Sequence, residues 1–304
     1  METGRTAPLL APIQHRLETT HDAPAFERDP QFVQRFLGVV DRALGWFSPE
    51  VRGIERVPAE GPALVVGNHC GAPIMPDAGA LFAALVRRRG VDRPTYSLAY
   101  DLLFALPGFG PSLRRLGMLP ADPSTAERAL GDGAAVLVYP GGDWEACRPW
   151  TERRRVELHD RAGFVRLSLR TGVPVIPAVA HGSHEAVVIL TRGDRLAHAV
   201  GLDKLRIKVL PFALSVPFGI APLPVPGVPL PTKVVVDVLE PLDWTRWYGR
   251  QDDTDVVRHC YEETVDHLQQ GLDRLDAEFP HPLLERLHLP VPHVPHARPH
   301  VVAR

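Results

Sequence analysis

The sequence predicts an α/β fold in which a largely buried sheet is flanked by helices. Short runs rich in valine, isoleucine and alanine, bounded by glycine and proline, indicate strands that are covered on both faces. Segments with helical spacing of apolar residues lie between these runs, and such alternation is typical of an α/β domain. The expected strands are residues 63–68, 135–140, 173–180 and 232–241, and the expected helices between them are residues 79–90, 124–133 and 160–172.

One further helix is expected before this region and one after it. Apolar residues recur every three or four positions from Phe32 to Phe47, which predicts an N-terminal amphipathic helix that begins at Asp29 or Pro30. Its aromatic stripe either packs on the core or inserts shallowly into a bilayer interface. A long C-terminal helix, over roughly residues 252–278, is expected to close the domain.

The chain is expected to hold one folded domain with a less ordered segment at each end. Residues 1–30 are polar with scattered prolines and predict a weakly ordered arm. Residues 31–279 form the folded domain. Residues 280–304 are rich in proline and histidine without helical or strand period, which predicts a mobile tail.

Composition excludes several classes of protein. The 304 residues are 45% hydrophobic, which is enough for a sizeable core, and 34 basic against 36 acidic side chains give a net charge of −2. Without a strong positive field, nucleic acid is not an expected partner. Three scattered cysteines do not form a disulfide framework, and the start of the chain lacks a secretory signal, so a cytoplasmic location is expected.

Residues 210–231 form an unusual segment without a charged side chain. Seven prolines interrupt it, and they prevent a continuous helix because they remove backbone donors. The segment is either a buried connection across the core, or a surface that touches a membrane or lines an acyl-chain groove. Elsewhere no run of about 18 apolar residues predicts a simple membrane-spanning helix.

Residues 67–77, GNHCGAPIMPD, contain a candidate catalytic pair. His69 follows a predicted buried strand, and open α/β sheets form their ligand crevices at such strand ends. A neutral imidazole can take a proton from a hydroxyl, while a carboxylate on its other nitrogen stabilises the imidazolium that forms. Asp77 is the nearest suitable carboxylate, with Asp101 as the second choice. The alternative is a turn that merely contains a histidine.

A second candidate site lies in residues 135–149, AVLVYPGGDWEACRP. Gly141 and Gly142 let a ligand approach the backbone, and exposed amides there can hold a phosphate or a developing oxyanion. A tight turn explains the two glycines equally well. Glu145 either orients an acceptor or holds the turn, and Arg148 is a candidate cation for an acceptor phosphate.

Four stretches in order resemble the motifs of the lysophospholipid/glycerolipid acyltransferase superfamily, over roughly residues 51–245. They are GNHCGAPIMPD, LGMLPAD, YPGGDWE and GVPVIPAV. YPGGDWE and DRAGFVRL are most similar to the branch of monoacylglycerol and diacylglycerol acyltransferase-like proteins. The resemblance implies a mixed sheet and transfer of a fatty acyl group from acyl-coenzyme A or acyl carrier protein to a glycerolipid hydroxyl at a membrane surface. It implies no metal or cofactor besides the acyl donor.

The chain departs from the superfamily pattern in two places. Seven residues separate His69 from Asp77 where the superfamily has four, so the loop between them must bulge for the pair to meet. LGMLPAD and YPGGDWE also lack the arginines that hold an acceptor phosphate in phosphatidate-forming relatives. This absence favours a neutral acceptor, because a buried phosphate needs a cationic partner. The alternative is a lysophosphatidate acyltransferase in which Arg148 or the run 153–155 supplies the cation.

Three other functions compete with acyl transfer. Cys70 beside His69 suggests a thiol hydrolase, although neighbouring side chains usually diverge in direction. His181, His184 and Glu185 suggest a metal site, although their spacing is not that of two histidines on one helix face. A non-catalytic lipid-binding module would need neither His69 nor Asp77.

Overall fold

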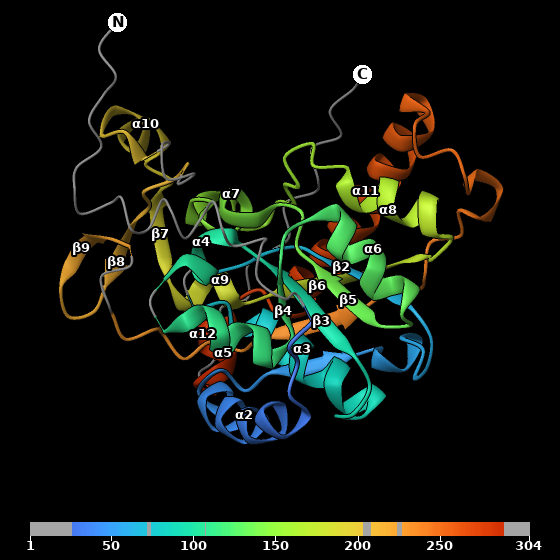
Figure 1. The fold of residues 1–304 in the computed structure, drawn as a ribbon. Coiled ribbons are helices and arrows are strands. Elements are labelled where there is room, and N and C mark those ends of the chain that lie inside the picture. Colours follow the sequence, from blue (N-terminus) through green and yellow to red (C-terminus); the bar gives the residue numbers. More distant parts are fainter. Residues whose placement is uncertain (1–25, 72–73, 107, 203–207, 224–226, 289–304) are drawn as a thin grey trace, which may run out of the picture.

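A mixed seven-stranded sheet forms the centre of the protein. The computed structural model describes residues 26–71, 74–106, 108–202, 208–223 and 227–288 (Figure 1). The strand order is β1-β10-β6-β2-β5-β3-β4, and the β10–β6 pair is antiparallel while the other neighbours are parallel. The strands are β1 Glu50–Arg52, β2 Ala63–Gly67, β3 Thr95–Ala99, β4 Met118–Pro120, β5 Ala135–Val138, β6 Val175–His181 and β10 Val235–Val238. The predicted α/β class and the mixed sheet are confirmed.

Helices cover both faces of this sheet, so the domain has three layers. The described helices are α2 Pro30–Leu44, α3 Pro76–Arg89, α4 Asp101–Ala105, α5 Phe109–Leu116, α6 Pro123–Gly131, α7 Gly142–Ala146, α8 Gly163–Thr171, α9 Ser183–Ala186, α10 Asp194–Ala199, α11 Thr254–Glu278 and α12 Pro282–Arg286. Alternate side chains of β2 enter two different hydrophobic cores (Figure 1). Leu64 and Val66 join the core that α6, α8 and α11 cover, and Ala63 and Val65 join the core that α2 and α3 cover.

The N-terminal helix α2 begins where the sequence predicts. The Asp29 side chain accepts the Phe32 amide at 3.1 Å, and Pro30 occupies the first turn, where its missing N–H costs nothing. Buried Val33 and Leu37 direct the helix onto α3 and α5. The apolar stripe is therefore mainly a packing face, and its residues are half-buried or buried.

Both chain ends are more ordered than predicted within the described residues. Phe26 lies edge-on to Tyr96, with ring centroids 5.4 Å apart, so the ordered chain begins before residue 30. At the other end, α12 occupies part of the predicted tail, and the Lys233 amide donates to the Pro282 carbonyl at 2.9 Å. The prediction of disorder was wrong for these two stretches. The rest of both predicted segments, residues 1–25 and 289–304, lies outside the described residues.

A second sheet, which the sequence did not predict, stands beside the main one. Its antiparallel strands are β7 Val188–Thr191, β8 Phe212–Ser215 and β9 Gly219–Pro222 (Figure 1). Ile189 and Ala213 point inward and are buried, whereas the directly paired Leu214 and Ile220 point outward and are 49% and 66% exposed. Residues 212–222 thus form a surface hairpin, and the prediction of a buried connection was wrong for β8 and β9. None of the described helices is both long and apolar enough to cross a bilayer.

Candidate active site

His69 lies just beyond the carboxyl end of β2, beside the end of β6. The fully buried Asn68 side chain joins these two strands: its Oδ1 accepts the Ala180 amide at 2.7 Å, and its Nδ2 donates to the Ala180 carbonyl at 3.1 Å. The strand end is therefore fixed directly before His69. Sequence reasoning missed Asn68, whose only signal was its position between the strand and the histidine.

The His69 imidazole is half-buried and stacks on a tyrosine. The ring centroids of His69 and Tyr139 are 4.4 Å apart with planes inclined by 18°. Burial, with a smaller contribution from the positive charge of Arg148, lowers the pKa of His69 to about 3. Nδ1 is buried and has no hydrogen-bond partner among the described residues. The ring is thus neutral at physiological pH.

Asp77 lies in the first turn of α3 and is fully buried. Burial raises its pKa to about 7, although the Ser183 hydroxyl and the amides of Asp77 and Ala78 oppose the rise. No hydrogen bond of ordinary geometry joins its carboxylate to another described residue, Ser183 and His69 included. Its charge raises the pKa of both Cys70 and Tyr139.

The longer spacing between His69 and Asp77 is taken up by a turn before α3. The Met75 amide donates to the Gly71 carbonyl at 3.1 Å, and Met75 itself has a left-handed backbone with φ of 45°. Gly71 has φ of 70°, and a Cβ there would lie 2.3 Å from the Ser183 carbonyl oxygen. Only glycine fits this contact, which packs the turn against α9.

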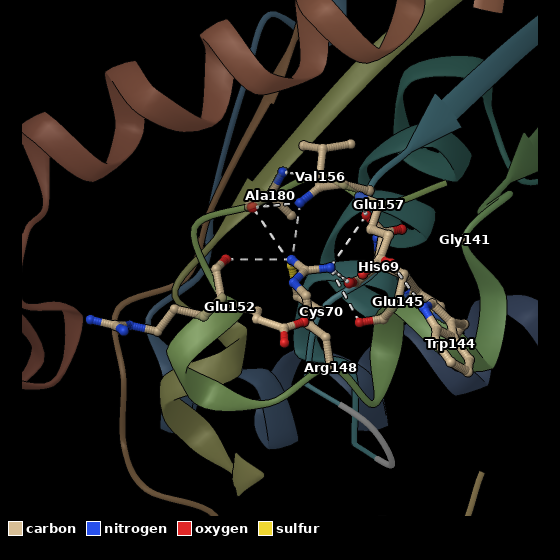
Figure 2. Close-up of polar contacts among 12 residues, drawn as sticks. His69, Cys70, Gly141, Trp144, Glu145, Arg148, Glu152, Val156, Glu157 and Ala180 are labelled. Atoms are coloured by element: carbon tan, nitrogen blue, oxygen red, sulfur yellow. Dashed lines mark hydrogen bonds and ion pairs between the residues drawn. The ribbon is translucent and has the colours of Figure 1, made fainter. Parts of the chain in front are cut away.

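Glu145 and Arg148 form a fully buried ion pair behind His69 (Figure 2). Glu145 Oε2 accepts the His69 amide at 2.8 Å, and Arg148 Nη1 donates to the His69 carbonyl at 3.1 Å. Burial raises the pKa of Glu145 to about 7, and the Arg148 charge opposes that rise. Arg148 Nη2 donates to the Arg153 carbonyl at 3.4 Å. Neither side chain reaches the surface, so the predicted contact of Glu145 or Arg148 with an acceptor is not supported.

The two glycines serve the local turn. A Cβ on Gly141 would lie 2.2 Å from Glu145 Oε2, so the missing side chain is what lets Glu145 fold back. The Gly142 amide donates to the Tyr139 carbonyl at 3.1 Å. The tight-turn interpretation therefore holds for Gly142, because its amide already donates a hydrogen bond within the turn.

The competing metal and thiol sites are not assembled. His181 Nε2 lies 2.9 Å from the Phe279 carbonyl, and Glu185 accepts from Arg153 at 3.1 Å. No three histidine, cysteine or acidic side chains gather in metal-binding geometry within the described part of the chain. Cys70 is buried, and burial raises the pKa of its thiol well above the ordinary range, so it lacks the thiolate that a nucleophile requires.

Two more residues of this region escaped sequence reasoning. The sequence predicted no role for Tyr139 beyond its place in the motif YPGGDWE, yet its ring stacks on the His69 imidazole. His184 was predicted only as a metal ligand, yet it is buried with neither ring nitrogen bonded to a described residue, and burial, aided by the Arg148 charge, holds its pKa well below the ordinary value. Two surface hollows, of about 540 Å³ and 390 Å³, are lined by other residues.

A neutral histidine at the carboxyl end of a central strand of a mixed α/β sheet is placed where enzymes of this fold class bind their ligands. The chain belongs to the acyltransferase family, whose model, described as Acyltransferase, matches residues 48–181. The protein is an O-acyltransferase of the lysophospholipid/glycerolipid acyltransferase superfamily.

Relatives and one solved structure agree with this assignment. An uncharacterized protein of Mycobacterium tuberculosis is 32% identical over 267 residues, covering 86% of this chain and 72% of that protein. The human "DGAT1/2-independent enzyme synthesizing storage lipids" is 29% identical over 140 residues, covering 46% and 42%. The 1-acyl-sn-glycerophosphate acyltransferase PlsC from Thermotoga maritima superposes with a TM-score of 0.53 at 18% identity over 81% of this chain and 80% of that one, which shows the fold alone.

Proposed function

We propose that this protein transfers a fatty acyl group from a thioester donor, acyl-coenzyme A or acyl carrier protein, to a neutral glycerolipid hydroxyl. The observation that carries the proposal is the pair of unsatisfied buried groups beside the β2 end. His69 Nδ1 and both Asp77 carboxylate oxygens are buried without a hydrogen-bond partner among the described residues. Such groups are costly when unpaired, and the proposal pairs them by letting the His69 ring donate to the Asp77 carboxylate.

In the proposed mechanism, His69 Nδ1–H donates to Asp77, which leaves Nε2 to accept the proton of the acceptor hydroxyl. The hydroxyl oxygen attacks the thioester carbonyl carbon and forms a tetrahedral intermediate. Its collapse breaks the carbon–sulfur bond, and the leaving thiolate takes the proton from the imidazolium. The products are an ester and a free thiol. Because the Gly142 amide is engaged, only the Gly141 amide is retained as an oxyanion donor.

The preference for a neutral acceptor is supported by how the nearby arginines are used. Arg148 is buried against the His69 backbone. Arg153 is paired with Glu185, Arg161 with Asp143, and Arg192 with Glu157, at 3.1, 3.2 and 2.6 Å. At each of these three arginines an acceptor phosphate would have to displace a carboxylate. A monoacylglycerol or diacylglycerol hydroxyl needs no such exchange.

Membrane contact is proposed to come from the β7–β8–β9 sheet, and the occupant of its outer face is a lipid surface. Leu214, Val216, Phe218 and Ile220 are exposed on or beside one hairpin, and residues 209–232 carry no charged side chain that would resist the headgroup boundary. The sheet is also continuous with the site, because β7 follows α9 after a single residue. Lipid substrates would therefore arrive beside His69.

The test is an acceptor panel with purified protein and labelled acyl-coenzyme A or acyl carrier protein. Lysophosphatidate, monoacylglycerol and diacylglycerol are compared by kcat/KM in vesicles of one composition. We expect ester product with the neutral acceptors and little with lysophosphatidate. A preference for lysophosphatidate would overturn the neutral-acceptor proposal, and binding of lipid without ester formation from any donor would overturn acyl transfer.

A further inference from the structure

Both backbone polar groups of His69 are held by one buried ion pair from a distant part of the chain. Its amide donates to Glu145 Oε2 at 2.8 Å, and its carbonyl accepts from Arg148 Nη1 at 3.1 Å (Figure 2). Glu145 Oε1 and Arg148 Nη1 are themselves 3.3 Å apart, and both side chains have zero exposure. The peptide groups on either side of the His69 Cα are thus fixed by charged partners, which make stronger hydrogen bonds than neutral ones.

The pair is held in place by further contacts of its own. Glu145 Oε1 accepts the Glu157 amide at 3.1 Å, and the missing Cβ of Gly141 leaves room for the carboxylate. Arg148 Nη1 also donates to the Glu145 carbonyl at 3.2 Å, which closes the i,i+3 turn between them. Each of the two side chains is therefore held by contacts beyond the ion pair itself.

Stability alone does not explain such a pair. A buried ion pair usually gains little over apolar side chains of similar volume, because both ions lose their hydration. Here Arg148 Nε also has no partner among the described residues, so the guanidinium is incompletely satisfied. The ion pair therefore contributes mainly through the backbone groups that it positions.

We propose that Glu145 and Arg148 act as one positioning unit that fixes the backbone of His69, so that its imidazole meets both Asp77 and the acceptor hydroxyl. Neither residue touches substrate. The unit matters in this chain because the turn between His69 and Asp77 is longer than the superfamily spacing, so the two residues are not held together by short sequence separation. Tyr139, stacked on the imidazole at 4.4 Å, sets the ring plane once the backbone is fixed.

The first test follows the His69 amide proton and needs no enzymatic activity. The protein is labelled with 15N-histidine, and the His69 resonance is assigned among the 14 histidines from its loss in His69→Gln. At pH 8 the charged Glu145 should shift this amide proton downfield, and Glu145→Gln should move it upfield. The control, Glu127→Gln, breaks a surface ion pair with Arg170 and should leave the resonance in place. An unmoved His69 resonance in Glu145→Gln overturns the contact.

The second test is kinetic and rests on the proposed acyl transfer. Glu145→Gln and Arg148→Met should each lower kcat by roughly 10-fold to 100-fold with KM within about 2-fold, because a misplaced base slows chemistry without weakening binding. The double variant should lose no more than the worse single variant, since the two residues act as a unit. Additive losses, or a change in KM alone, would overturn the proposal.

Folding is controlled with a conservative variant. Arg148→Met leaves a lone buried carboxylate and risks unfolding, whereas Arg148→Lys keeps the charge and one donor. Arg148→Lys should therefore recover part of the lost kcat. Equal activity of Arg148→Lys and wild type would mean that the guanidinium contacts with the His69 and Glu145 carbonyls are not needed, which contradicts the proposal. If wild type and all variants form no ester but the amide shift occurs, acyl transfer is overturned and the positioning contact stands.

Discussion

Replacing Asp77 with asparagine should make the protein more stable while lowering its activity. Burial raises the Asp77 pKa from 3.8 to about 7, so the folded state binds the Asp77 proton more tightly than the unfolded state does. The stability that Asp77 contributes is therefore present at low pH and is lost as pH rises from about 4 to about 7. Asparagine has a similar shape and no charge, so the free energy of unfolding of the variant does not fall over this pH range for this reason.

The magnitude follows from the two pKa values. At about 1.4 kcal/mol per pKa unit, the ionised Asp77 costs about 4 kcal/mol at pH 8 and about 2 kcal/mol at pH 5. The asparagine amide brings its own desolvation cost of about 1–3 kcal/mol, but this cost is the same at both pH values. The difference between the two pH values is thus the quantity to measure: from pH 5 to pH 8 the variant should gain about 3 kcal/mol relative to wild type.

The assay is urea unfolding of wild type and Asp77→Asn at pH 5 and pH 8. Asp266→Asn, at an exposed position on α11, is the control and should show no pH-dependent gain. In parallel, acyl transfer by Asp77→Asn should fall by roughly 10²-fold to 10⁴-fold, because the imidazolium loses its carboxylate partner. An equal stability difference at both pH values would refute the burial argument, and unchanged turnover would refute the proposed role of Asp77.

Two further predictions test the surface hairpin and the glycine turn. In liposome flotation, Phe218→Asp with Ile220→Asp should abolish membrane binding, whereas Val39→Asp on α2 should not, because the α2 stripe packs on the core. The opposite pattern would show that α2 binds the membrane. Loss of self-association without loss of flotation would show that the hairpin face binds a second copy of the chain. Gly141→Ala should lower both stability and kcat, because its Cβ would meet the Glu145 carboxylate at 2.2 Å, and a urea midpoint and kcat equal to wild type would show that the turn does not need glycine.

The main sheet could be predicted because its strands have a strong local signal. The runs that form β2, β5 and β6 are apolar up to the final His181 of β6, as burial on both faces requires, and the structure places these strands side by side. The second sheet could not be predicted in this way. Its strands β8 and β9 are short and lie among prolines, and apolar side chains occupy both the inner and the outer face. Without polar alternation, the outer face has no sequence signature.

The candidate site was predictable in its motifs but not in its contacts. His69 and Asp77 were predicted from a strand end and the nearest carboxylate, and in the structure His69 stacks on Tyr139 while Asp77 lies buried in the first turn of α3. Arg148 was a candidate cation for an acceptor phosphate in the alternative function, because a sequence shows the charge of an arginine and not the direction of its side chain. That direction depends on β2 ending beside α7, which is a contact between segments more than 70 residues apart.

The central claim is that His69 removes the proton from the acceptor hydroxyl. The most direct measurement is single-turnover ester formation from labelled acyl-coenzyme A and monoacylglycerol by His69→Ala, with the fold checked by circular dichroism and by a urea midpoint close to that of wild type. The account predicts no ester above the uncatalysed rate in the folded variant. Ester formation by folded His69→Ala at a rate near that of wild type would contradict it.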